Sequence, residues 1–172
     1  MLILSAVSDI NPTKVSKFMV RYFTEDTSFS LKGKRLVSKW LARVASDRGY
    51  DLGDLNYIFC SDAYLLAINK QFLEHDYETD IITFDNSEDY FLETGKRGVS
   101  ADIYISVDTV RINGKAYGEG FERELRRVIV HGLLHLTGCD DQDAWHQQRM
   151  RAAENRALAL YDRMKEESLH VG

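Results

Sequence analysis

The sequence has little proline, little cysteine and no apolar run long enough to span a membrane. One proline in 172 residues, with 44% hydrophobic and 28% charged residues, excludes a Pro-rich linker and a disordered chain. Cys60 and Cys139 form no C-x-x-C pair, which favours a reducing compartment over a disulfide-stapled secreted domain. The apolar segment Met1–Val7 is too short for a membrane span and lacks the basic region of a signal peptide. We therefore expect a cytoplasmic protein without a membrane partner.

The chain also lacks an excess of positive charge, since its net charge is −5. A globally basic domain would have indicated nucleic-acid binding directly. Positive residues are nevertheless grouped at Lys32–Arg43 and at Arg123–Arg127. Such groups can follow a phosphate backbone, although they are more often the solvated faces of helices. The overall charge is therefore a weak argument against a nucleic-acid partner.

The most informative residues are His131 and His135, which are followed by Gly138 and Asp141. Two histidines four positions apart on a helix leave the same face, so both can reach one ion. Gly138 permits the left-handed conformation that ends a helix, which would bring Asp141 round as a third ligand. Three protein ligands leave the fourth position open, as in catalytic zinc sites. We predict a single zinc ion bound by His131, His135 and Asp141.

Other interpretations of this segment remain open. Residues 128–136 are apolar on nearly all sides, and a lone histidine there would usually be a core residue. The spacing matches the pattern His-x-x-x-His-x-x-Gly-x-x-ligand, which favours a metal. Cys139 is better explained as a small packing residue than as a thiolate ligand. Asp140 and His146 are weaker candidates than Asp141 for the third ligand.

Gly132 occupies the position where zinc peptidases carry a glutamate as general base. Because glycine has no side chain, a standard zinc peptidase is disfavoured. The base must then be the metal hydroxide, a carboxylate from elsewhere in the fold, or the substrate.

The spacing of apolar residues predicts a single α+β domain, in which a small mixed β-sheet packs against a central metal-binding helix and several further helices. We expect this domain at residues 19–172, and we expect residues 1–18 to be an N-terminal extension or the product of an upstream start. Trp40 is expected in the core. The polar segment 86–98 is expected to be an exposed loop or hairpin connection. The predicted strands are 20–23, 56–60, 80–84 and 103–105, and the predicted helices are 36–44, 62–72, 106–116, one from 121 and a long one from after 141 to about 163.

Three segments resemble a known family. Residues 131–141 resemble the signature H-G-x-L-H-L-x-G-Y-D-H of the YbeY family, bacterial endoribonucleases implicated in rRNA maturation. Residues 68–84 match the family's L-N-x-x-Y-R-x-x-D-x-P-T-D-V-L-S-F without gaps, and residues 101–103 match its G-D-I. Met150 and Glu154 lie where the last helix of the family usually has Met and Glu. The resemblance extends over roughly residues 55–160.

The resemblance implies a zinc-dependent endoribonuclease specific for single strands, which acts in rRNA processing and ribosome quality control. Its substrates would be single-stranded RNA and rRNA, and its partners the ribosome or ribosomal proteins. Thr79 and Asp80 match the family's T-D and are candidates for catalytic residues or for residues that support the ligands. They could equally form a capped junction between a helix and a strand. Asp102 has the same ambiguity, and we favour a structural role for it.

The chain departs from the family at two positions. Asp141 replaces the usual third histidine, and a carboxylate oxygen is an acceptable zinc ligand at about 2.0–2.2 Å. The added negative charge should make the bound water less acidic and broaden the range of metals. Leu73 replaces an arginine whose forked donors could hold a phosphate. The role of that arginine must therefore be absent or supplied elsewhere.

Two alternatives remain at this point. One is a zinc-dependent amide hydrolase in which Glu154 or another carboxylate replaces the usual base. The other is a non-catalytic, ribosome-associated factor that uses the metal only for folding.

Overall fold

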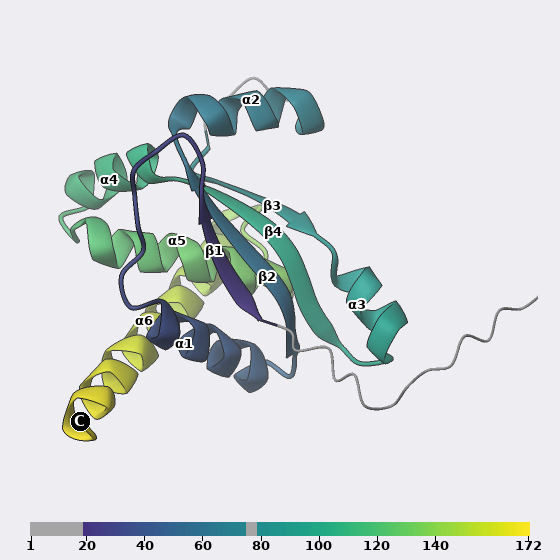
Figure 1. The fold of residues 1–172 in the computed structure, drawn as a ribbon, viewed down its shortest axis with the longest axis vertical. Helices are drawn as coiled ribbons and strands as arrows, with labels where there is room; N and C mark the ends of the chain where they lie inside the picture. The colour runs from purple at the N-terminus through teal and green to yellow at the C-terminus, as the bar shows by residue number, and fades with distance from the viewer. Residues whose placement is uncertain (1–18, 75–78) are drawn as a thin grey trace, which may run out of the picture.

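The computed structural model describes residues 19–74 and 79–172, which form a β-sheet with helices on both faces (Figure 1). The predicted extension at residues 1–18 lies outside the described residues. Within the described ranges, no helix is long and apolar enough to cross a membrane. Along the chain the elements are β1 (Val20–Thr24), α1 (Lys34–Asp47), β2 (Asp51–Cys60), α2 (Asp62–Leu73), β3 (Ile81–Asp85), α3 (Ser87–Thr94), β4 (Gly98–Ser106), α4 (Val107–Ala116), α5 (Phe121–Leu136) and α6 (Ala144–His170).

The strands of the described residues lie in the order β1-β2-β4-β3. β1 pairs with β2 and β2 pairs with β4 in parallel, whereas β3 runs antiparallel to β4. Parallel neighbours need a crossover connection, and α1 provides the one between β1 and β2. The sheet is therefore mixed and the fold is α+β, which confirms the predicted class.

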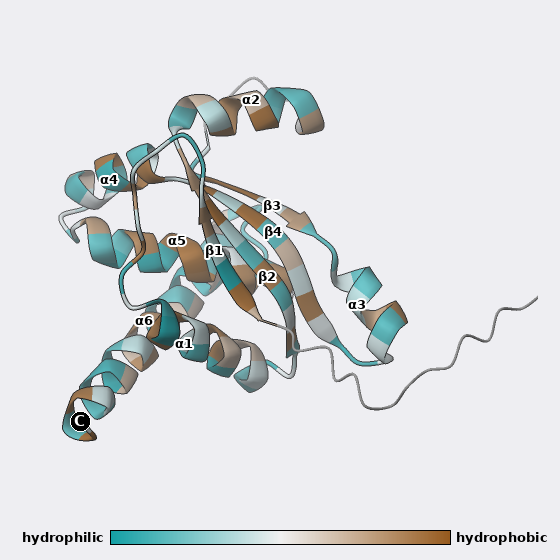
Figure 2. Cartoon of the chain, viewed as in Figure 1, coloured by the Kyte–Doolittle hydropathy of each residue, from teal (hydrophilic) through white to brown (hydrophobic). Residues whose placement is uncertain are grey.

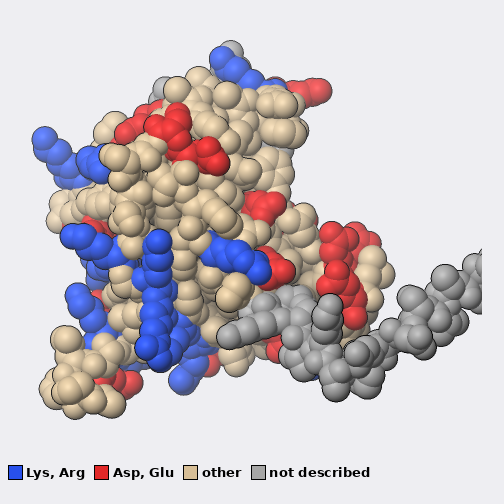
Figure 3. Space-filling model, viewed as in Figure 1, with Lys and Arg blue, Asp and Glu red and all other residues tan. Residues whose placement is uncertain are grey.

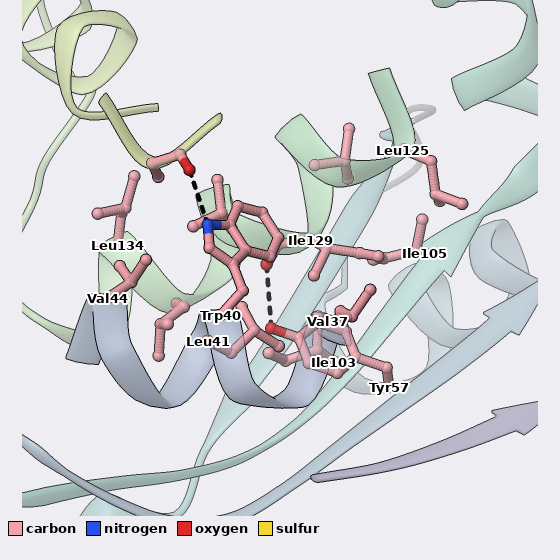
Figure 4. Packing of buried hydrophobic residues seen from close by; sticks show 14 of the residues in the cluster. Val37, Trp40, Leu41, Val44, Tyr57, Ile103, Ile105, Leu125, Ile129 and Leu134 are labelled. Atoms are coloured by element: carbon pink, nitrogen blue, oxygen red, sulfur yellow. Dashed lines mark hydrogen bonds between the residues drawn. The ribbon is translucent and has the colours of Figure 1, made fainter. Parts of the chain in front are cut away.

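The main core lies between the sheet and the layer formed by α1, α5 and α6, where buried apolar side chains pack together (Figure 4). Along these helices apolar residues alternate with polar ones (Figure 2). Trp40 of α1 is fully buried, as expected, and its Nε1–H donates to the Ala157 carbonyl of α6 at 2.7 Å. The buried Tyr57 hydroxyl of β2 donates to the Ile129 carbonyl of α5 at 3.0 Å. Aromatic residues with a polar end thus fix α5 to the sheet and α6 to α1.

A smaller cluster lies on the opposite face of the sheet, where α2 covers the ends of the strands. Leu65 and Ile68 of α2 pack there against Cys60 and Ile82. Ile81 and Ile82 point to opposite faces because side chains alternate along a strand. The face that bears Ile81 therefore meets α5.

The prediction of an exposed loop at residues 86–98 is wrong, because this segment contains α3 and the first residue of β4. Tyr90 of α3 is buried, and its ring lies so close to Gly98 that a Cβ atom at that position would overlap it. Tyr90, packed against a glycine, is therefore the buried anchor of α3, whose other large apolar side chains, Phe91 and Leu92, are exposed. The last helix also continues to His170, beyond the predicted end near residue 163.

Candidate metal centre

The two histidines lie in the last two turns of α5, immediately before a tight turn. Gly138 has φ = 95°, the left-handed conformation that ends the helix. The Cys139 N–H donates to the Leu134 carbonyl at 2.9 Å and so closes the end of the helix. Asp140 Oδ1 then accepts from the Asp141 N–H at 2.7 Å, which turns the chain back and orients Asp141.

The structure brings the donor atoms of His131, His135 and Asp141 into a compact triangle. The two Nε2 atoms are 3.0 Å apart. Asp141 Oδ2 lies 3.6 Å from the Nε2 of His131 and 3.3 Å from that of His135. Tetrahedral zinc with ligands at about 2.0–2.1 Å separates its ligand atoms by about 3.4 Å. The triangle therefore has the dimensions of one face of a zinc tetrahedron, and the donor types suit zinc.

His131 has a buried carboxylate behind it. Its Nδ1–H donates to Glu154 Oε2 of α6 at 3.0 Å, and Glu154 is only 5% exposed. A hydrogen bond at Nδ1 fixes the tautomer, so the lone pair of Nε2 points to the other donors. Burial lowers the pKa of His131, but the hydrogen bond from Nδ1 to Glu154 and the charges of Glu154, Asp141 and Asp80 outweigh burial. The pKa therefore lies above its ordinary value.

Glu154 is held in turn by Arg127, a buried residue of α5. Arg127 Nη1 lies 3.3 Å from Glu154 Oε1 and donates to Asn155 Oδ1 at 2.9 Å. Its Nη2 pairs with Glu119 at 3.0 Å. Arg127 is thus an internal cation that positions the carboxylate behind His131. It does not contribute to an exposed basic surface.

Thr79 and Asp80 lie beside the donor triangle. Together with His131, His135 and Asp141 they line a cavity of about 620 Å³. Burial raises the pKa of Asp80, although the charge of His131 and backbone hydrogen bonds oppose this effect. The Thr79 hydroxyl donates to the Ile81 carbonyl at 3.1 Å, as a residue that stabilises the start of β3 would. Asp80 therefore has the position of a site residue, and Thr79 has that of a supporting one.

The other candidates lie outside the triangle. His146 pairs with Asp143 at the exposed start of α6, at 2.7 Å. Asp140 is used in the turn described above, and the Cys139 sulfur accepts from Arg48 at 3.0 Å. On β4, Asp102 accepts from Asn56 at 2.9 Å, which is a contact between strands. Among the described residues, His131, His135 and Asp141 form the group of three potential metal ligands whose donor atoms lie close together.

Gly132 faces the sheet and not the candidate metal ligands. A Cβ atom there would lie 3.1 Å from Ile81 Cδ1 and 3.5 Å from Ile103. The position that carries the base in zinc peptidases is therefore used for close packing of α5 on β3 and β4.

Sequence reasoning missed two polar residues of the cavity, Thr83 and Asp85 on β3. The alternation along β3 could have found them, since residues 79, 81, 83 and 85 line the same cavity. It also considered Glu154 only as a substitute base and missed its contact with His131. This contact joins residues 23 positions apart on two helices, and local spacing cannot show it.

Two helix-borne histidines and a carboxylate that converge in an α+β domain are the donor set of a metal-dependent hydrolase. Comparison with known proteins gives the particular family. The model for the family described as Endoribonuclease YbeY matches residues 20–162, and the chain belongs to this family.

Relatives named Endoribonuclease YbeY match over most of both chains. The one from Cytophaga hutchinsonii is 45% identical over 81% of this chain and 93% of its own length. The one from Phocaeicola vulgatus is 45% identical over 83% of this chain and 98% of its own. The solution structure of TM1509 from Thermotoga maritima is similar with a TM-score of 0.59 and 25% identity, over 87% of this chain and 93% of that one.

Proposed function

We propose that this protein is a zinc-dependent endoribonuclease that cuts single-stranded RNA and acts in rRNA processing and ribosome quality control. Membership of the Endoribonuclease YbeY family supports the reaction. The metal dependence is supported by the triangle of His131 Nε2, His135 Nε2 and Asp141 Oδ2, with sides of 3.0, 3.3 and 3.6 Å.

The residues of the site then have distinct roles. His131 and His135 would hold the ion through Nε2, and Asp141 would hold it through Oδ2. When bound, zinc would supply a Lewis acid for a phosphate oxygen and would increase the acidity of a water or a ribose 2′-hydroxyl. Glu154 keeps the proton of His131 on Nδ1, so Nε2 stays available.

Asp80 is the proposed proton acceptor in this site. Its pKa is raised by burial, so its carboxylate is more basic than an exposed one, and it lines the same cavity as the ligands. Thr79 is proposed to position Asp80, because its hydroxyl fixes the start of β3 through Ile81. In the amide-hydrolase alternative Glu154 is not available as the base, since it is already bound to His131 and Arg127.

The test combines metal analysis with RNA cleavage by the purified protein. We expect zinc at about one ion per chain. We expect cleavage of single-stranded but not double-stranded RNA, and loss of cleavage in His135→Ala and Asp141→Ala. His170→Ala is the matched control, because His170 is exposed at the far end of α6. If the two ligand variants stay folded without zinc and still cut RNA, catalysis by the metal is refuted. A wild type that binds zinc and rRNA but cuts neither RNA nor peptides would favour the non-catalytic factor.

The proposal extends to partners and location. The RNA would be presented on the ribosome or by ribosomal proteins in the cytoplasm, and residues 19–172 would act as one domain. Cys60 and Cys139 are both free thiols, which agrees with a reducing compartment. Co-sedimentation of the protein with ribosomal subunits tests the partner, and a wild type found only in the unbound fraction would contradict it.

A further inference from the structure

A second concave surface lies on the far side of the turn that carries Asp141. It consists of two adjoining clefts of about 530 and 360 Å³ between α6 and the C-terminal part of α1. We call it the α1/α6 groove. It begins at the turn 138–140 and continues along α6 to residue 163. Its charged lining is mostly arginine, namely Arg43, Arg48, Arg149, Arg156 and Arg163. The carboxylates in this lining are Asp47 and Asp140.

The arginines of α6 form a regular row. Arg149, Arg156 and Arg163 are seven residues apart, which corresponds to nearly two turns of helix, so they share one side. The row is about 21 Å long at 1.5 Å per residue. Figure 3 shows Lys and Arg side chains gathered over α1 and α6 on the face in view. The groove thus has the length and charge to follow an extended polyanion.

Two of these cations are available for a ligand. Arg156 and Arg163 are exposed, and among residues 19–74 and 79–172 neither has an ion-pair or hydrogen-bond partner. Nearby arginines are used otherwise: Arg151 lies 3.5 Å from Glu154, and Arg43 pairs with Asp47 at 3.0 Å.

The end of the groove nearest the metal centre carries an exposed aromatic side chain. Trp145 is 59% exposed and lines the groove, with the Arg149 guanidinium 4.6 Å above its ring. A cationic track with an aromatic platform is the combination by which proteins hold single-stranded nucleic acid. Arg48 has another role, since it donates to the Thr137 hydroxyl at 2.6 Å and builds the wall below the turn.

The metal centre itself is a poor place to gain affinity for phosphates. Asp80, Asp85 and Asp141 line its cavity, and Leu73 stands where the family pattern has an arginine. The turn 138–141 separates the two surfaces, with Asp140 on the groove side and Asp141 on the metal side. An RNA strand that passes this turn would therefore reach both.

We infer that the α1/α6 groove binds the single-stranded flank of an RNA whose scissile phosphate lies at the metal centre. Arg156 and Arg163 contact phosphates, and Trp145 stacks on a base near the turn. This inference rests on the proposed endoribonuclease function, and it assigns the affinity for RNA to residues outside the metal centre.

Binding of a 2′-O-methyl oligonucleotide of about 16 nucleotides to the zinc-free protein tests the groove directly, because the measurement does not depend on cleavage. Each phosphate contact with a single strand contributes about 0.7 to the slope of log K against log salt. The double variant Arg156→Ala/Arg163→Ala should therefore reduce the magnitude of this slope by about 1.4. If the double variant and the wild type bind equally at about 1 M salt, the double variant should bind about 25-fold more weakly than the wild type at about 0.1 M salt. Trp145→Ala should weaken binding about fivefold or more with an unchanged slope.

Lys165→Ala is the matched control, since it removes one positive charge from an exposed position of α6 outside the groove. Alanine is the best helix former, so all these variants should keep α6 intact, which circular dichroism verifies. A double variant whose salt slope equals that of the wild type, or a Lys165→Ala variant with the same loss, would overturn the inference.

A cleavage assay separates the groove from the endoribonuclease proposal. In the wild type, kcat/KM should increase from a tetranucleotide to the longer RNA, and in the double variant this dependence on length should disappear. A double variant that keeps the wild-type length dependence rejects the groove. If the wild type cuts neither RNA, the endoribonuclease proposal fails and the binding experiment alone decides the groove.

Discussion

The carboxylate behind His131 offers the sharpest test of how the site is built. Glu154→Gln keeps the shape of the side chain but removes its charge. Glu154 now accepts from His131 Nδ1 at 3.0 Å and lies 3.3 Å from Arg127, inside the protein. The loss of a partner behind a metal ligand typically costs about 10- to 100-fold in metal affinity. This corresponds to about 1.4–2.7 kcal/mol of binding free energy.

The same change should affect folding only moderately. Arg127 would still contact Glu119 at 3.0 Å and Asn155 at 2.9 Å, so its buried charge stays paired. We therefore expect the free energy of unfolding to fall by about 1–3 kcal/mol, the cost of a lost charged hydrogen bond. An orphaned buried charge would cost about 3–5 kcal/mol.

The affinity is measured by competition with a chromophoric zinc chelator at neutral pH. Glu167→Gln is the control, because it removes the same charge from an exposed position of α6. If Glu154→Gln binds zinc as tightly as the wild type while Glu167→Gln behaves normally, Glu154 does not orient His131 and the reasoning is refuted.

Three further results are expected. Zinc affinity should decrease as the pH is lowered, and the decrease should begin above pH 6.5, because the pKa of His131 lies above its ordinary 6.5 and protons compete with zinc for Nε2. Zinc titrations at several pH values check this, and a decrease that begins well below pH 6.5 would contradict it. Gly132→Glu should lower the free energy of unfolding by more than about 3 kcal/mol in urea and create no peptidase, since a Cβ there already lies 3.1 Å from Ile81; a stable variant that cuts peptides would disprove this. Arg48→Ala should cost about 1–3 kcal/mol and weaken zinc binding, because Arg48 donates to the Thr137 side chain and carbonyl at 2.6 and 3.1 Å; thermal unfolding with and without zinc measures both effects.

The helices and strands with regular apolar spacing were predictable, and α3 was not. Periodicity identifies an element when a whole face is buried, as in α1 or α5. The buried residue of α3 is Tyr90, and its partner Gly98 lies on the next strand. That contact exists only after the chain has folded, so the local pattern of apolar residues does not predict it.

The same distinction applies to the candidate site. His131, His135 and Asp141 come together through one helix and one turn, and both are specified by neighbouring residues such as Gly138. Glu154 requires α6 to pass behind α5, which follows from packing over the whole core and not from spacing within one segment.

The charged residues show why the net charge of a chain says little about the charge of any one surface. In the basic group Arg123–Arg127, Arg127 is buried, and Arg123 is paired with Glu119 at 3.2 Å and Asp162 at 3.4 Å. The three groove arginines of α6, Arg149, Arg156 and Arg163, lie seven residues apart, so no short window of the sequence displays them as a group. Folding aligns them on one side of α6 while the net charge stays at −5. Charges beyond about 8 Å are largely screened at physiological salt, so a phosphate in the groove would respond to these arginines and hardly to the distant carboxylates. An acidic chain can therefore offer RNA a locally cationic track.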